Sequence, residues 1–104
     1  MSATALDACL LRRAASRAVG TLKVLANEER LLLLCQLSQG ELCVSALEER
    51  LDIHQPTLSQ QLGVLRNGGV VNARRAGKRI FYSIADQQGM KILRVLYRIY
   101  CPAT

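Results

Sequence analysis

The chain has 104 residues, half of them hydrophobic, with a formal net charge of +6 at pH 7 and a pI near 9.6. This length makes one small domain with a single modest core. Four cysteines are too few for a disulfide scaffold, and the longest apolar run is far too short to span a bilayer. We therefore expect a cytoplasmic, non-membrane protein with reduced thiols, and the basic balance favours a polyanionic partner.

The first third of the chain predicts two helices. Residues from about Ala5 to Ala26 are rich in Ala, Leu and Arg, with Gly20 as a weak point. Asn27 is a suitable cap for the next helix, because the two glutamates that follow it occupy a first turn where negative charge is favourable. This helix is expected to end at Gly40. Apart from Gln36, its residues 31–37 are apolar around the axis, so we expect this stretch to be core.

Residues 44–66 are the most informative stretch of the sequence. Val44–Leu51 is a short amphipathic segment, and the tight turn 52–55 joins it to a second helix. Pro56 suits the first turn of that second helix, where its missing N–H would be unpaired anyway. Three leucines then recur at i, i+4 and i+7, the spacing of one helix stripe: Leu58, Leu62 and Leu65. Two short helices with a tight turn are typical of the helix-turn-helix motif.

The outer face of the second helix is polar and carries no charge before Arg66. A helix that is merely solvated would usually be charged there. Short hydroxyl and amide side chains, together with Gly63, suit a surface that approaches the edges of DNA bases closely. The predicted DNA-binding residues of this segment are Gln55, Thr57, Ser59 and Gln60.

A hairpin is expected after this helix. Asn67–Gly69 stops the helix, and Val70–Arg74 and Arg79–Ile84 predict two strands closed by residues 75–78. Three side chains of the second strand are expected to alternate toward the core: Ile80, Tyr82 and Ile84. Four cations are expected together in one short loop of the hairpin: Arg74, Arg75, Lys78 and Arg79. Beside a helix-turn-helix we interpret the hairpin as a wing that contacts backbone phosphates, which gives affinity rather than sequence choice.

The last helix is expected over about Gln87–Tyr100. Its single polar stripe consists of Lys91, Arg94 and Arg98, at i, i+3 and i+7. So little polar surface implies burial on most sides, against the domain and against a second copy. Together with the first helix, it is the expected dimer interface. Such a dimer would present two recognition helices to a palindromic operator, with half-sites about one turn (~34 Å) apart.

Four runs of sequence carry a family resemblance: Gln55–Leu62, Val64–Arg66, Gly69–Val71 and, at the end of the hairpin, Phe81–Tyr82. Over about Leu22–Cys101 the chain resembles the ArsR/SmtB family of winged-helix repressors. The resemblance implies a mainly α fold of five helices with a two-stranded wing, forming one DNA-binding domain over residues 1–104 in a homodimer. The chain departs from the family in the turn, where Asp52 replaces a frequent glycine, and Asp tolerates left-handed conformations.

Two cysteines extend the resemblance. The ending Ile-Tyr-Cys-Pro around Cys101, and Cys35 in the run Leu-Leu-Leu-Leu-Cys, resemble the thiol-switch branch of the family, the BigR, SqrR and HlyU type, which senses reactive sulfur species or oxidants. The resemblance implies that Cys35 and Cys101 are the sensing thiols. A thiolate attacking a persulfide would leave a persulfidated cysteine, which the partner thiol then resolves. Which thiol attacks first, and whether the bridge is a disulfide or a polysulfide, are open at this point.

A metal site is not expected. Metal-sensing relatives carry a Cys-Val-Cys pair where this chain has Cys43–Ser45, and serine is a poor ligand for soft ions. Residues 90–100 contain no His, Asp or Glu, and the single histidine, His54, is expected in the turn. The alternative to a thiol switch is a metalloid-sensing repressor that uses Cys43 and another cysteine such as Cys9.

Two other classes of protein are less consistent with the sequence. A thiol enzyme would need a Cys-x-x-Cys pair or a cysteine partnered by histidine, and neither is evident, so we expect no enzyme and no cofactor. A basic protein–protein module with the same fold would show little salt-sensitive binding to duplex DNA. The prediction is a dimeric repressor that binds double-stranded operator DNA and releases it when Cys35 and Cys101 become linked by persulfide or another oxidant.

Overall fold

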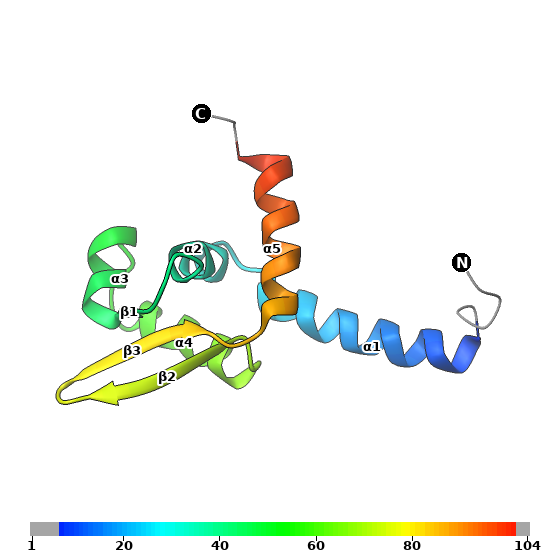
Figure 1. The fold of residues 1–104 in the computed structure, drawn as a ribbon, viewed down its shortest axis with the longest axis horizontal. Coiled ribbons are helices and arrows are strands. Elements are labelled where there is room, and N and C mark those ends of the chain that lie inside the picture. The colour runs from blue at the N-terminus through cyan, green and yellow to red at the C-terminus, as the bar shows by residue number, and fades with distance from the viewer. Residues whose placement is uncertain (1–6, 102–104) are drawn as a thin grey trace.

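The computed structural model describes residues 7–101, which form five helices and a three-stranded antiparallel sheet (Figure 1). In chain order the elements are α1 (Ala8–Leu25), α2 (Glu28–Leu37), β1 (Leu42–Cys43), α3 (Val44–Leu51), α4 (Thr57–Asn67), β2 (Val71–Ala76), β3 (Arg79–Ile84) and α5 (Gln87–Tyr100). The predicted fold class is confirmed, with one difference: the sheet has a third strand. Ala5 at the predicted start of the first helix, and Pro102, lie outside the described residues.

Helix α1 extends away from the rest of the molecule (Figure 1). The Asp7 carboxylate caps it by accepting hydrogen bonds from the N–H groups of Cys9 (2.9 Å) and Leu10 (3.2 Å). The helix continues through Gly20 without a break. Only its last turn is anchored in the core, where Leu25 is buried, so most of the apolar surface of α1 is exposed in a single protomer.

Helix α2 is the centre of the core and packs against α1, α3, α4 and α5. Asn27 caps it as predicted, because the Asn27 Oδ1 accepts a hydrogen bond from the Arg30 N–H at 3.0 Å. Three of its leucines are buried: Leu33, Leu34 and Leu37. The expectation that all of residues 31–37 are core is wrong at Leu32, which is 41% exposed. The elements that surround α2 leave the side of the helix that carries Leu32 uncovered in a single protomer.

Arg30 joins three helices through its guanidinium group. Its Nε donates to the carbonyl oxygen of Val24 at 2.5 Å, and its Nη2 donates to that of Lys23 at 3.1 Å. Both carbonyls belong to the last turn of α1, where helix carbonyls lack partners within the helix. Its Nη1 donates to the Gln61 Oε1 on α4 at 2.8 Å. The side chain therefore fixes the end of α1 against the fourth helix.

Helices α3 and α4 form the predicted helix-turn-helix. Asp52 has a φ of 55° and a ψ of 35°, so the left-handed turn expected there is present. Pro56 immediately precedes the first residue of α4, and Ile53 is buried beneath the turn. The leucine stripe of α4 is confirmed as core, since three side chains are fully buried: Leu58, Leu62 and Leu65.

The wing differs from the prediction in three respects. Strands β2 and β3 pair from Val71↔Ile84 to Ala76↔Arg79, so the turn contains two residues instead of the four predicted. Gly77, the first of the two, has a φ of 64°. Near this tip Ile80 is 41% exposed, contrary to expectation, because it lies beyond the body of the domain. Strand β1 pairs with β3, and its two residues are too few to show an alternating pattern in the sequence.

Helix α5 spans the predicted residues, and the Asp86 carboxylate caps it by accepting a hydrogen bond from the Gln88 N–H at 2.9 Å. Met90 is buried, whereas Val95 and Ile99 are exposed. At about 100° per residue these two exposed side chains lie on the side of the helix opposite Met90. None of the helices in the described part of the chain has the length and apolar character needed to cross a bilayer.

We predict that Arg30→Ala lowers the free energy of unfolding by about 2 kcal/mol. The substitution removes three charge-assisted hydrogen bonds from a half-buried guanidinium and leaves two carbonyls at the end of α1 without a protein partner. Arg12→Ala is the matched control, since Arg12 is exposed on α1 and its loss should change the free energy by less than about 0.5 kcal/mol. Urea denaturation of both variants tests this, and equal midpoints would contradict it.

Candidate functional site

The polar face of α4 is available for contacts. Ser59 and Gln60 are exposed, and Thr57 is half-buried. The Gln55 Oε1 accepts hydrogen bonds from the Ser59 N–H (3.1 Å) and from the Ser59 hydroxyl (2.7 Å). Gln55 thus takes over the capping of α4, because the preceding Pro56 offers no side-chain hydrogen bond. Sequence reasoning missed this internal role, which fixes the orientation of the Ser59 hydroxyl on the exposed face.

The four wing cations do not form a single cluster. In a strand, successive side chains point to opposite faces, so Arg74 and Arg75 lie on opposite faces of the sheet. The pairing Ala76↔Arg79 places Arg79 on the Arg74 face. Lys78 is exposed in the turn. The expectation of four cations in one short loop is therefore corrected, because three of them belong to strands.

Arg74 is bound within the molecule. Its Nε and Nη2 donate to the Glu41 carboxylate at 2.7 and 2.6 Å, and its guanidinium carbon lies 4.7 Å from the centre of the Phe81 ring. The hydrogen bond from Arg74 holds the pKa of Glu41 below its ordinary value. The geometry gives Arg74 a structural partner, whereas its predicted phosphate contact stays a prediction.

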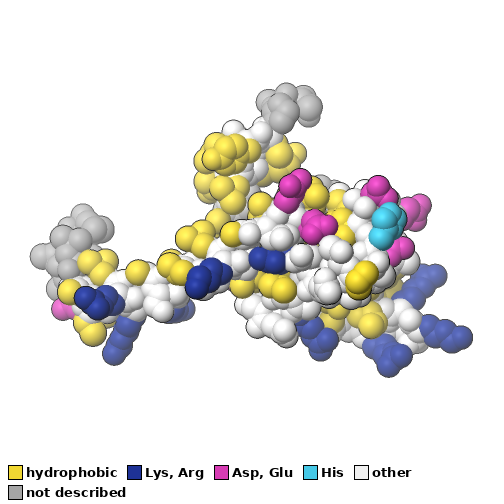
Figure 2. Space-filling model, turned by 180° about the vertical axis from the view of Figure 1, so that it is seen from behind, with side chains coloured by type: hydrophobic (Ala, Val, Ile, Leu, Met, Phe, Trp, Pro, Cys, Tyr) yellow, Lys and Arg dark blue, Asp and Glu magenta, His cyan; other side chains and the backbone are white. Residues whose placement is uncertain are grey.

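Charge is distributed unevenly over the surface. Figure 2 shows Lys and Arg side chains along the lower edge at the end that carries the wing, and acidic side chains on the opposite edge around the single histidine. That histidine, His54, lies in the helix-turn-helix turn as predicted, with its Nε2 2.8 Å from the Asp52 Oδ1. The two edges therefore differ in sign, and the lower edge, which carries the wing, is the one suited to a polyanion.

Cys35 and Cys101 line the same groove between α2 and α5. This thiol groove has a volume of about 850 Å³ and is lined by Cys35, Gln36, Ser38, Gln39, Met90, Leu93, Arg94, Tyr97, Arg98 and Cys101. Cys101 directly follows α5, is exposed, and donates its N–H to the Tyr97 carbonyl oxygen at 2.8 Å. Burial raises the pKa of the half-buried Cys35, and the nearby Cys101 thiol raises it further. The two predicted sensing residues thus line one groove, Cys35 from α2 and Cys101 from the residue that follows α5.

The other two cysteines lie elsewhere. The Cys43 Sγ shares a hydrogen bond of 3.3 Å with the Ser45 hydroxyl. This bond, the Ala46 N–H and the charge of Arg79 lower the pKa of Cys43. Cys9 lies near the start of α1, at the far end of the protomer from β1 (Figure 1). Residues 7–101 contain no group of three His, Cys, Asp or Glu side chains that could hold a metal ion.

Comparison with known proteins gives a family and close relatives. The family model described as "Bacterial regulatory protein, arsR family" matches residues 27–73, from the cap of α2 into β2. The biofilm growth-associated repressor of Agrobacterium fabrum is 54% identical over 80 residues, covering 77% of this chain and 68% of the repressor. The transcriptional activator HlyU of Vibrio cholerae is 39% identical over 93 residues, covering 89% of this chain and 86% of HlyU.

Solved structures give the same result. The transcriptional repressor BigR from Xylella fastidiosa superposes with a TM-score of 0.84 at 42% identity, covering 89% of this chain and 95% of BigR. The homodimeric winged helix-turn-helix DNA-binding domain of Mb0332 from Mycobacterium bovis superposes with a TM-score of 0.73 at 32% identity, covering 85% and 82% of the two chains. Both similarities extend well beyond the matched helix-turn-helix segment.

The two pKa shifts predict an order of alkylation. A thiolate is the reactive form, so at pH 7.5 the lowered pKa of Cys43 and the raised pKa of Cys35 should make Cys43 react several-fold faster with iodoacetamide. Raising the pH should increase the rate at Cys35 more steeply, because that thiol ionises at higher pH. Ser45→Ala should slow Cys43 alone. Peptide mass spectrometry of timed samples tests this, and faster alkylation of Cys35 than of Cys43 would contradict it.

Proposed function

The chain belongs to the arsR family of bacterial regulatory proteins, and we propose that it is a dimeric transcriptional repressor that releases its operator when Cys35 and Cys101 become linked. The family comprises DNA-binding transcriptional regulators rather than enzymes. The observation that carries the proposal is the thiol groove, because it holds both cysteines between the central helix α2 and the exposed helix α5. The whole chain, residues 1–104, acts as one winged-helix domain with dimerisation helices at its two ends.

Binding to double-stranded DNA is supported by two adjoining surfaces. The exposed face of α4 offers Ser59 and Gln60, whose side chains are suited to hydrogen bonds with base edges. The wing extends beside it and presents Arg75, Lys78 and Arg79, which suit backbone phosphates. Arg74 can join these contacts only by exchanging the Glu41 carboxylate for a phosphate.

Dimerisation is supported by the apolar surface that one protomer leaves uncovered. On α1 the exposed side chains include Leu11 and Leu22, and on α5 they include Val95 and Ile99. Contiguous apolar surface of this kind marks an interface. An isologous pairing of α1 and α5 with a second copy buries these side chains and presents two α4 helices on one side of the dimer.

The switch is a sulfur exchange that conserves atoms and electrons. A thiolate attacks the outer sulfur of a persulfide R–S–SH, which gives protein Cys–S–SH and the thiol R–SH. The second thiolate then attacks the inner sulfur of Cys–S–SH, which gives Cys35–S–S–Cys101 and releases hydrogen sulfide. The persulfide is thereby reduced and the two cysteines are oxidised.

The bridge acts on DNA binding through α2. Cys35 and Arg30 belong to the same helix, and Arg30 donates to Gln61 on α4. A bridge that pulls the end of α5 toward α2 changes the angle between these two helices. Because α5 belongs to the proposed dimer interface and α2 supports α4, the spacing of the two α4 helices in the dimer changes as well. A hundredfold loss of operator affinity corresponds to a coupling free energy of about 2.7 kcal/mol, within the ordinary range for allosteric proteins.

We predict a division of labour between α4 and the wing. Gln60→Ala should change discrimination among operator variants by about 1–3 kcal/mol, because an amide that reads a base edge is lost. Arg75→Ala should weaken binding to all sequences similarly and flatten the dependence of log K on log salt by about one unit. Fluorescence anisotropy with operator variants at several salt concentrations measures both effects. The opposite pattern in the two variants would contradict the assignment.

We predict that the thiol switch requires both cysteines. Cys35→Ser and Cys101→Ser should each fold, dimerise and bind the operator, because serine removes reactivity more than volume. After persulfide treatment both variants should stay bound, while the parent protein loses two thiols, gains a bridge between the peptides that contain Cys35 and Cys101, and releases DNA. Mass spectrometry and anisotropy on the same samples measure this.

Cys43→Ser is the matched control and should respond like the parent, since Cys43 lies outside the thiol groove. Normal release by either Cys35→Ser or Cys101→Ser would rule out the paired-thiol mechanism. Stoichiometric release of DNA by arsenite or cadmium, abolished in Cys43→Ser, would instead favour the metalloid-sensing alternative that uses Cys43 and a second cysteine such as Cys9.

A further inference from the structure

We propose that the thiol groove selects anionic persulfides, and that Arg94 and Arg98 are the residues that recognise their carboxylates. The inference rests on the proposed function, because it names the chemical class of the persulfide that delivers sulfur to Cys35 and Cys101. It concerns the two arginines that share the groove with these thiols. Neither arginine has a part in the sulfur exchange itself.

The groove is positively charged. Arg94 and Arg98 line it together with both thiols, and no acidic side chain is among its lining residues. Within residues 7–101 the ion pairs are His54–Asp52 and Arg74–Glu41, so both groove arginines are without an acidic partner there. Guanidinium groups bind carboxylates through paired, charge-assisted hydrogen bonds. A donor that carries carboxylates would therefore be attracted toward the thiols.

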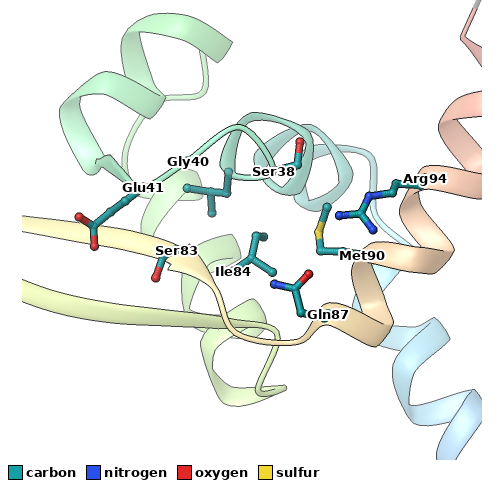
Figure 3. A pocket seen from close by; sticks show the side chains of 9 residues that line it. Ser38, Gly40, Glu41, Ser83, Ile84, Gln87, Met90 and Arg94 are labelled. Atoms are coloured by element: carbon teal, nitrogen blue, oxygen red, sulfur yellow. The ribbon is translucent and has the colours of Figure 1, made fainter.

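A second, polar pocket continues the groove past Arg94. This adjoining pocket has a volume of about 280 Å³ and shares Ser38, Met90 and Arg94 with the thiol groove. In Figure 3 the Arg94 side chain extends from α5 toward Met90, with Ser38 above and Gln87 below the two side chains in this view. Arg94 thus lies at the junction of the groove with this pocket, whose lining combines amide and hydroxyl groups with apolar side chains and the Glu41 carboxylate. That carboxylate is paired with Arg74, so Arg94 is the cation of the pocket without an acidic partner in residues 7–101.

The groove stays open in the proposed dimer. At about 100° per residue, Cys101 lies on the Met90 side of α5, whereas Val95 and Ile99 lie on the opposite side. A partner protomer that covers the Val95 side therefore leaves the groove side to solvent. Arg94 and Arg98 lie on the flank nearer the groove, and a small anionic molecule reaches them without separation of the protomers.

The charge that the arginines recognise must lie on the R group of the persulfide R–S–SH, which leaves as R–SH after sulfur transfer. The test therefore compares three donors whose R groups differ in charge. Glutathione persulfide, with two carboxylates, is the anionic probe. 2-Hydroxyethyl persulfide is the neutral probe, and cysteamine persulfide is the cationic one. For each probe, the rate of Cys35–Cys101 bridging is divided by the rate at which the same probe reacts with a free small thiol. This ratio cancels differences in the intrinsic reactivity of the probes.

The parent protein should bridge about tenfold faster with the anionic probe than with the neutral one, which corresponds to about 1.4 kcal/mol. Added salt should reduce this preference, because exposed charges are screened. Arg94→Gln combined with Arg98→Gln should bring the ratio close to one while operator binding by the reduced protein persists. Lys91→Gln is the matched control, since it removes one charge from the same stripe of α5 outside the groove lining and should keep the ratio.

The ratio of the two rates separates recognition from thiol activation. If the arginines only stabilised a thiolate, the double variant would slow all three probes equally and the ratio would stay unchanged, which would overturn the inference. Equal normalised rates for the three probes with the parent protein would also overturn it, while leaving the thiol switch intact. Failure of every probe to bridge Cys35 and Cys101 would overturn the switch and the inference together.

Discussion

The structure depends on the position of α2, which Arg30 fixes at one end. This helix fills the core with leucines, and the Arg30 guanidinium binds the open carbonyls of α1 and the amide of Gln61 on α4. A single side chain thus holds the proposed dimer helix and the proposed recognition helix at a set distance. At its other end α2 contributes Cys35 to the groove shared with α5. In the proposed switch, a change in how α5 packs against α2 would therefore alter the position of α4.

This arrangement would let a small redox event control DNA binding in the proposed switch. The two thiols lie on separate elements, and the core between α2 and α4 is formed by well-packed leucines that transmit displacement instead of absorbing it. The half-buried position of Cys35 raises its pKa, so its neutral thiol persists at higher pH than that of a free cysteine. The exposed Cys101 is open to small molecules. Burial on one side and access on the other suit a site that responds to a reagent yet stays reduced without one.

Sequence reasoning was most successful where a periodic pattern or a cap exists. The leucine stripe of α4, the Asn27 cap, the turn at Asp52 and the bounds of α5 follow from local rules. It failed where the outcome depends on distant partners. Neither the pairing of β1 with β3 nor the Arg74–Glu41 contact, 33 residues apart, leaves a local signal. The Cys35–Cys101 pair came from family resemblance, because no spacing rule places a residue of one helix and the residue after another helix beside one groove.

The projection of α1 from the domain links folding to the amount of protein present. Leu11 and Leu22 are 44% and 53% exposed in a single protomer, so they bury further apolar area only when a second copy covers them. Part of the free energy that keeps the protein folded is therefore supplied by association. Mass action then makes the thermal midpoint rise with protein concentration. A cell that makes few copies therefore holds a less stable regulator as well as a scarcer one, and the exposed helices of unpaired protomers become substrates for proteases.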